Sequence, residues 1–247
     1  MLQNKLRDSR RVSSQVRKPG EIEWARDTQH DGETVTMSHA EPSPRVVRKC
    51  AECGEPYALR VDGGIGSCEP PWPDLFDSFV TTFTEQVLVT CPDCEELVFT
   101  KACKKLTEIP GFSFDVDYID VMPSTPPTYK KCRQLVDQLE AGLRLSKTRQ
   151  IQLRKWLWWT GNHPRRYEAP DIPLSPSERT NLLALKEILD LDKDINLITV
   201  VEICRELGEF DAMRSYASKI QGKGEREFVA DIIALSDSYG NKFISLQ

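Results

Sequence analysis

The chain contains the stretch Lys49-Cys50-Ala51-Glu52-Cys53-Gly54-Glu55-Pro56-Tyr57 and, further along, the stretch Thr90-Cys91-Pro92-Asp93-Cys94-Glu95. Each stretch holds a Cys-x-x-Cys pair. A pair with this spacing forms a tight turn that presents both thiolates on one side of a loop. Zinc prefers four soft ligands in a tetrahedron, which two such turns together supply. We therefore predict one structural Zn²⁺ site whose ligands are Cys50, Cys53, Cys91 and Cys94.

The two motifs resemble the two knuckles of a zinc ribbon, over about residues 46–105. The resemblance implies a small β module in which the ion contributes folding energy. It implies no reaction, because four protein ligands leave no position for a substrate water. Iron, a redox dithiol and coincidence are the alternatives. Redox chemistry of the thioredoxin type needs a Cys-x-x-Cys pair at a helix N-terminus, whereas both pairs here lie among β signals.

The spacing of the two motifs departs from the usual pattern. The 37 residues between Cys53 and Cys91 exceed the roughly 15–20 residues of common four-cysteine sites. We expect an inserted hairpin or loop there, with the proline-rich segment around Trp72 as the candidate. Cys68 and Cys103 are further candidate ligands, although a lone cysteine is more often a small buried hydrophobe.

The surroundings of the cysteines read as β structure between residues 46 and 121, because they are rich in β-branched and aromatic residues and contain turn signals. One segment near its end alternates between apolar and polar residues, as a strand with one wet face does. The strands are expected at residues 57–61, 80–84, 87–90, 97–99 and 112–118.

Beyond residue 128 the pattern changes to helix, since apolar residues recur at helical spacing from Cys132 to Leu143. Whether Gly142 divides one long helix into two is left open. We expect Ser146 to cap a helix that stops at Gly161, and Pro164 to lie in a connector. Ser175 and Glu178 form a capping-box pattern that starts another helix. Further helices are expected near residues 195–207, 211–220 and 225–238.

The segment Glu206-Leu207-Gly208-Glu209-Phe210-Asp211-Ala212 resembles the helix–turn–helix of a tetratricopeptide repeat (TPR). The resemblance implies that Gly208 permits the turn, Phe210 lies between the helices, and Ala212 lets them approach. It covers less than one full period of about 34 residues and has no second copy. Repeat arrays usually need about three stacked units, so we expect a compact helical bundle that contains one TPR-like hairpin.

These observations predict an α+β protein with three parts. Residues 1–45 form a flexible tail that is expected to be disordered, because charges, glycines and prolines dominate it and apolar residues are scattered. Residues 46–122 form the zinc-ribbon-like β module, and residues 128–247 form the α-helical module.

Composition and the first residues indicate in which cellular compartment the protein is expected. The formal net charge is −5 and apolar residues make up 39% of the chain. No apolar run reaches the roughly 18 residues that a membrane span needs. The first residues lack the apolar core of a secretory signal. We therefore expect a cytoplasmic protein with no membrane partner, and in that reducing setting paired cysteines more often bind metal than form disulfides.

One block of the chain is strongly basic. Residues 144–167 contain seven basic side chains and no acidic one, together with Trp156, Trp158, Trp159 and Tyr167. Aromatic and basic side chains can stack bases and hold phosphates, as single-strand binders do. Packing of the tryptophans against neighbouring helices, with the arginines solvated or paired, is the interpretation that we favour.

Nothing in the sequence resembles a catalytic constellation. His163 lies in an expected loop without a nucleophile beside it, and strand alternation accounts for Asp115 and Asp117. We therefore predict a non-enzymatic zinc-binding protein that acts through protein–protein interaction. The alternative is a nucleic-acid-binding protein that uses the ribbon and the basic aromatic segment 144–167.

Overall fold

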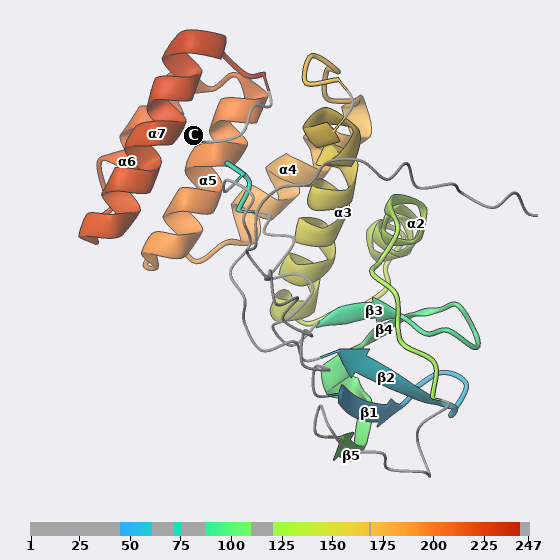
Figure 1. Ribbon diagram of the computed structural model, residues 1–247. Coiled ribbons are helices and arrows are strands. Elements are labelled where there is room, and N and C mark those ends of the chain that lie inside the picture. Colours follow the sequence, from blue (N-terminus) through green and yellow to red (C-terminus); the bar gives the residue numbers. More distant parts are fainter. Residues whose placement is uncertain (1–44, 61–71, 76–86, 110–120, 168, 243–247) are drawn as a thin grey trace, which may run out of the picture. The chain divides into compact units, whose positions relative to one another are not determined.

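The computed structural model describes residues 45–60, 72–75, 87–109, 121–167 and 169–242 (Figure 1). These residues form five β-strands, one short 3-10 helix and six α-helices, which confirms a mixed α+β protein. Several predictions lie outside the described residues. These are the N-terminal tail up to residue 44, the strands at 80–84 and 112–118, Cys68, Asp115 and Asp117.

The first cysteine motif is the turn of a β-hairpin. Strand β1 (Arg45–Lys49) pairs antiparallel with β2 (Pro56–Arg60) and, on its other side, with β5 (Lys104–Ile109). The resulting three-stranded sheet has the order β2-β1-β5, visible in Figure 1. Val47 and Tyr57 are fully buried. They lie on opposite faces of the sheet, because Val47 pairs with Ala58 whereas Tyr57 pairs with Arg48, so both faces of the sheet are covered at this point.

The second cysteine motif is also the turn of a hairpin. Strand β3 (Leu88–Thr90) pairs antiparallel with β4 (Leu97–Phe99), and the 3-10 helix η1 (Thr100–Ala102) leads on to β5. Residues 122–125 join the two hairpins. Ala58 of β2 exchanges backbone hydrogen bonds with Met122 and Ser124, and Thr90 of β3 does so with Thr125. One short segment thus ties both hairpins together.

Two separate helices follow. Helix α2 (Tyr129–Glu140) is capped by Thr128, and Gly142 leaves the helical region with a φ of 111° before α3 (Lys147–Tyr167) begins. The expected end of the second helix was wrong, because α3 continues through Gly161 and contains Pro164.

Close packing explains the glycine inside α3. A Cβ atom on Gly161 would lie 2.8 Å from Oε1 of Glu178 and 3.3 Å from the ring of Tyr129. Gly161 therefore allows α3 to approach its neighbours instead of ending the helix. A glycine in the sequence can therefore indicate either the end of a helix or a close contact between helices.

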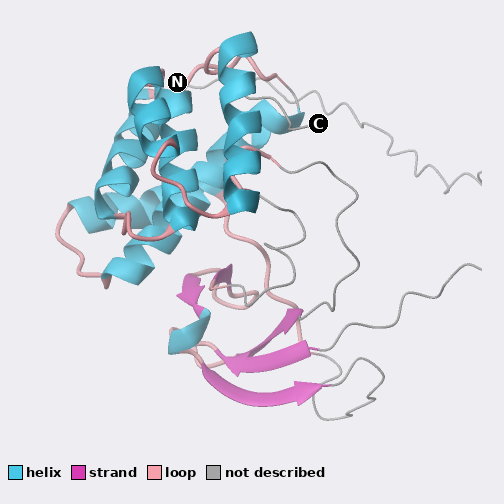
Figure 2. Cartoon of the chain, turned by 90° about the vertical axis from the view of Figure 1, so that its left-hand side faces the viewer, coloured by secondary structure: helices cyan, strands magenta, loops and turns pink. Residues whose placement is uncertain are grey.

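The remaining helices agree with the predicted segments. They are α4 (Pro176–Ile188), α5 (Asp194–Leu207), α6 (Phe210–Ala217) and α7 (Lys223–Tyr239), shown with the strands in Figure 2. The predicted capping box at Ser175 and Glu178 is confirmed. Gly208 adopts a φ of 78° between α5 and α6, and Phe210 packs against the helical core. No helix in the described ranges has the length and apolar character to cross a membrane.

The second hairpin shares a hydrophobic cluster with two helices. Leu88 is fully buried beside Cys132 and Val136 of α2 and Leu153 of α3, and Phe99 packs against the same cluster. Residues 72–75, which lie between the two cysteine motifs, also contact α3. Asp74 is 1% exposed, and the ring of Trp72 meets that of Tyr167 edge-on, with 6.1 Å between the ring centroids.

Candidate metal centre

The two cysteine turns have the same backbone construction. In each, the first cysteine directly follows a strand, and the next strand begins six residues after it. The N–H of Cys50 donates to the carbonyl of Glu55 at 2.8 Å, and the N–H of Cys91 donates to that of Glu96 at 3.0 Å. The N–H groups of Gly54 and Glu95 donate back to the carbonyls of Cys50 and Cys91. The two turns are thus equivalent halves of one site.

The fifth residue of each turn adopts a left-handed backbone. Gly54 has a φ of 82°, and Glu95 has a φ of 59°. Glycine takes this conformation at no steric cost, whereas a residue with a Cβ atom is strained by about 1–2 kcal/mol. The first turn therefore uses the expected glycine, and the second holds the same shape with a glutamate. Lys131 of α2 donates to the Glu95 carbonyl across the turn.

The four predicted ligands converge. Their sulfur atoms all lie within 4.8 Å of one another, with 3.9 Å between Cys50 and Cys94 and 3.8 Å between Cys53 and Cys91. An ion bound tetrahedrally with metal–sulfur bonds of about 2.3 Å separates its sulfurs by about 3.8 Å. The four thiols are therefore positioned to bind one metal ion.

The protein surroundings affect the protonation of the thiols. Burial raises the pKa of Cys91 to about 12 and raises that of Cys94 as well. Burial has the same effect at Cys50, but hydrogen bonds from the backbone of Cys53 and Glu52 outweigh it and lower the pKa of this thiol. A metal ion must displace protons from such thiols, so its binding releases protons.

The hydrophobic cluster beneath the cysteines includes a fifth thiol. Cys103 is buried with Tyr57, Leu59, Val89 and Val98, and its Sγ lies 3.7 Å from the Phe99 carbonyl. It is not a member of the four-sulfur group. Cys103 therefore serves as a small core residue, which is the more common role that the sequence assigned to a lone cysteine.

Two tryptophans and three arginines of the basic aromatic segment 144–167 are buried inside the protein. Trp156 and Trp158 are 6% and 3% exposed, and Arg154 donates to the side chain of Asn181 at 3.2 Å. Their ring faces contact protein atoms instead of solvent. His163 is exposed and lies 4.9 Å from the ring of Tyr167. The favoured packing interpretation of the segment agrees with these contacts.

A network of buried charges was missed by the sequence analysis. Arg166 pairs with Asp74, and Asn162 donates to both Asp74 and Glu206 at 3.0 Å. The residues that pair in this network lie far apart along the chain and on different elements. No local spacing predicts such a network, although the lack of acidic residues in 144–167 indicates that its arginines need distant partners.

Comparisons of the chain with family models, curated proteins and solved structures find no match.

Proposed function

We propose that the protein is a non-enzymatic, cytoplasmic zinc-binding protein that acts through protein–protein interaction. The observation that carries the proposal is the group of four cysteine sulfurs within 4.8 Å of one another. Four thiolates favour zinc, and a full shell of protein ligands leaves no site for a substrate. In this proposal the ion holds two hairpins of a zinc-ribbon-like module together.

The helical module carries the proposed contact surface. Leu183 of α4, Leu191 between the helices and Ile195 of α5 are 42%, 39% and 52% exposed. Large apolar residues that gather on a surface mark sites of protein interaction. Leu183 lies on α4, Leu191 lies between α4 and α5, and Ile195 lies on α5, the first helix of the TPR-like hairpin formed by α5 and α6. We infer that a protein partner covers them.

A pair of charge variants tests this surface. Full-length tagged protein that carries Leu183→Glu and Ile195→Glu should lose partners that the wild-type chain retains from native cells. Leu106→Glu changes an exposed residue of β5 and serves as the matched control, which should retain the same partners. Equal retention by all three proteins would contradict the proposed surface.

Nucleic-acid binding remains the second candidate because like charges face each other in the three-stranded sheet. Lys49 of β1 stands opposite Lys104 of β5, and both side chains are exposed. Like charges directly across a sheet are destabilising unless an anion lies between them. Binding of a single-stranded oligonucleotide should then weaken steeply with salt and fall in Lys49→Gln/Lys104→Gln. An absence of binding at low salt would exclude this function.

A further inference from the structure

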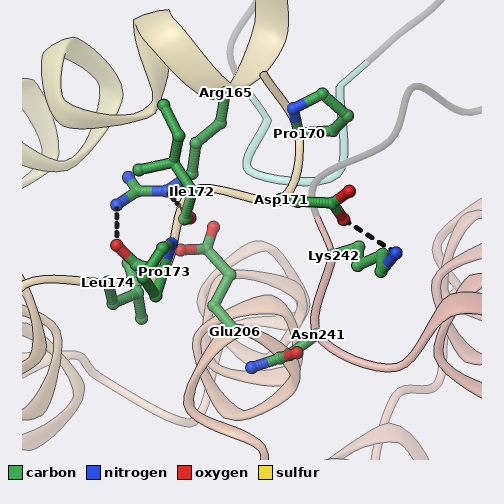
Figure 3. Close-up of a pocket in the computed structure, with 9 residues that line it drawn as sticks. All are labelled: Arg165, Pro170, Asp171, Ile172, Pro173, Leu174, Glu206, Asn241 and Lys242. Atoms are coloured by element: carbon green, nitrogen blue, oxygen red, sulfur yellow. Dashed lines mark hydrogen bonds and ion pairs between the residues drawn. The ribbon is translucent and has the colours of Figure 1, made fainter.

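The helical part holds a cavity of about 350 Å³ between the loop after α3 and the segment after α7 (Figure 3). Its charged groups are already used by the protein, because Arg165 pairs with Glu178 and Lys242 pairs with Asp171. Burial raises the pKa of Glu206, which also lines the cavity, to about 8. No cysteine stands among the described residues that line it. The cavity therefore offers neither an unpaired charge nor a thiol, unlike the metal centre.

The four sulfurs of the metal centre are not equally accessible. Cys53 is exposed and Cys94 is half-buried, whereas Cys50 and Cys91 are 3% and 0% exposed. The sulfur of Cys50 also accepts a hydrogen bond from the N–H of Glu52 at 3.4 Å. A small molecule from solvent therefore reaches Cys53 first.

Each accessible sulfur lies close to a buried sulfur of the other hairpin. Sγ of Cys53 lies 3.8 Å from that of Cys91, and Sγ of Cys94 lies 3.9 Å from that of Cys50. Cys50 and Cys53 belong to the turn between β1 and β2, and the other two to the turn between β3 and β4. A disulfide holds its sulfurs about 2.05 Å apart, so either pair needs an approach of about 1.8 Å. Disulfides between the hairpins thus require only a small movement.

The chemistry of a metal site makes the exposed sulfur reactive. A cysteine that binds a metal ion is held as a thiolate, which is the nucleophilic form. Hydrogen peroxide converts an accessible thiolate to a sulfenic acid, which a neighbouring thiol converts to a disulfide; otherwise oxidation continues to the irreversible sulfinic acid. At Cys53 the neighbouring sulfur of Cys91 is already in place. The arrangement therefore favours the reversible product.

We propose that the metal centre is a redox-sensitive site, in which hydrogen peroxide oxidises Cys53 and Cys91 to a disulfide that joins the two hairpins. The inference rests on the proposed function, because it requires the four thiolates to hold an ion. The Cys53 sulfur attacks a peroxide oxygen, so that the O–O bond breaks and hydroxide leaves. The Cys91 sulfur then displaces a second hydroxide from the sulfenic acid. Two thiolates thus give two electrons to one peroxide, and two solvent protons convert the hydroxides to water.

The disulfide leaves Cys50 and Cys94 as the remaining two donors. Structural zinc sites use four ligands, so the ion should leave the chain. A second peroxide then joins Cys94 to Cys50 through the same two steps. Each disulfide replaces the ion as a link between the hairpins and constrains the unfolded chain. We therefore expect the oxidised chain to lose its metal and to keep its β structure.

Disulfide mapping of the zinc-loaded full chain after titration with hydrogen peroxide tests the proposal. Cys68→Ser is the background, so that each turn contributes the two thiols of one tryptic peptide. Trypsin cuts after residues 49, 60 and 101, which places the first turn in peptide 50–60 and the second in peptide 61–101. Disulfides between the hairpins link the two peptides, whereas disulfides inside each Cys-x-x-Cys motif leave them separate.

We expect a zinc indicator to report release of the ion after about one equivalent of peroxide, because one peroxide forms one disulfide. Mass spectrometry should then find the two peptides linked through Cys53 and Cys91, and a thiol reductant should separate them. Two unlinked peptides, each with an internal disulfide, would overturn the proposal. A zinc-loaded chain that excess peroxide leaves unchanged would overturn it as well.

The backbone resonances give a second readout. The oxidised, zinc-free chain should keep the resonances of residues 45–60 and 88–109, whereas the reduced chain should lose them when a chelator removes the ion. The residues that line the cavity in Figure 3 belong to the helical part and should be unaffected by peroxide. Loss of the β resonances on oxidation would contradict the proposed link between the hairpins.

The matched variants are Cys53→Ser and Cys103→Ser. The first removes the exposed sulfur and should slow zinc release by peroxide at least about three-fold, because the remaining thiolates are less accessible. The second removes a buried thiol outside the four-sulfur group and should react like the wild type. Equal rates for Cys53→Ser and the wild type would contradict the role of Cys53. Where Cys53→Ser does not load zinc, the disulfide map of the Cys68→Ser chain still decides.

The order of the measurements separates this inference from the proposed function. A reduced chain that holds no zinc before peroxide is added would overturn the proposed function, and the redox site with it. A chain that holds zinc but forms no disulfide between the hairpins would overturn only the redox site.

Discussion

At the scale of single residues, the two cysteine turns impose the same backbone on different side chains. Gly54 and Glu95 occupy the same left-handed position, and each donates its N–H back to the first cysteine of its turn. Only one of them is a residue that favours this conformation. The second turn therefore carries strain that the first does not.

Exchanging side chains at this position should give opposite results in the two turns. Gly54→Ala introduces a Cβ at a φ of 82° and should destabilise the protein by about 1 kcal/mol. Glu95→Gly relieves the strain, although added freedom of the unfolded chain offsets part of the gain, so stability should be equal or higher. Urea unfolding of the metal-bound proteins measures both. Equal destabilisation by the two changes would show that the turns are not equivalent.

Glu206 predicts a second residue-scale effect, on the pH dependence of stability. Its raised pKa means that the folded chain holds a proton that the unfolded chain releases above about pH 4.3. Its contribution to stability is therefore complete below that pH and is lost as the pH rises towards 8. Between pH 6 and pH 8.5 the wild type should lose about 2 kcal/mol more than Glu206→Gln. Parallel stability curves for the two proteins would contradict this.

At the scale of secondary-structure elements, the start of α4 combines a cap with a buried ion pair. The Ser175 hydroxyl accepts from the N–H of Glu178, whose carboxylate accepts from the N–H of Ser175 at 2.7 Å. The same carboxylate pairs with Arg165 of α3. The capping contacts at the start of α4 thus also hold Glu178 in position to pair with Arg165 of α3.

Removing the cap separates these contributions. Ser175→Ala should destabilise the protein by about 1 kcal/mol, because it removes one acceptor and leaves the ion pair in place. Glu178→Gln should cost more, since Arg165 would then be buried without a charged partner. Thermal unfolding of both variants tests the order of the two effects. A larger loss from Ser175→Ala would contradict the assigned role of the ion pair.

At the scale of the whole molecule, local patterns predict local structure. The two Cys-x-x-Cys motifs, the capping box at Ser175 and the helices from residue 194 onward agree with the prediction, because their signals lie within a few residues of each other. The predicted helix end at Gly161, with Pro164 in a connector, was wrong. The packing of α3 against Glu178 and Tyr129 outweighs the helix-ending tendency of these two residues. Asp74 and Glu206 could not be predicted to share a network, because they meet only in the folded chain.

Removing the ion should affect the β structure first. The hydrophobic cluster around the cysteines is small, and two of its buried members, Cys50 and Cys91, are themselves proposed ligands. A chelator should therefore abolish the backbone resonances of folded residues 45–60 and 88–109 before those of α4 to α7, which have a separate and larger core. Acid should do the same, because protons compete for the four thiolates. Simultaneous loss of all resonances would show that the helices also depend on the ion.

The most direct measurement is metal analysis of the full chain, purified without added metal, combined with X-ray absorption at the metal edge. The four-sulfur geometry predicts one zinc ion per chain with four sulfur neighbours at about 2.3 Å. Cys94→Ser should reduce the sulfur count to three, whereas Cys103→Ser should leave it at four. A metal-free chain in a reducing buffer, or a shell that contains fewer than four sulfurs in the wild type, would contradict the proposed centre.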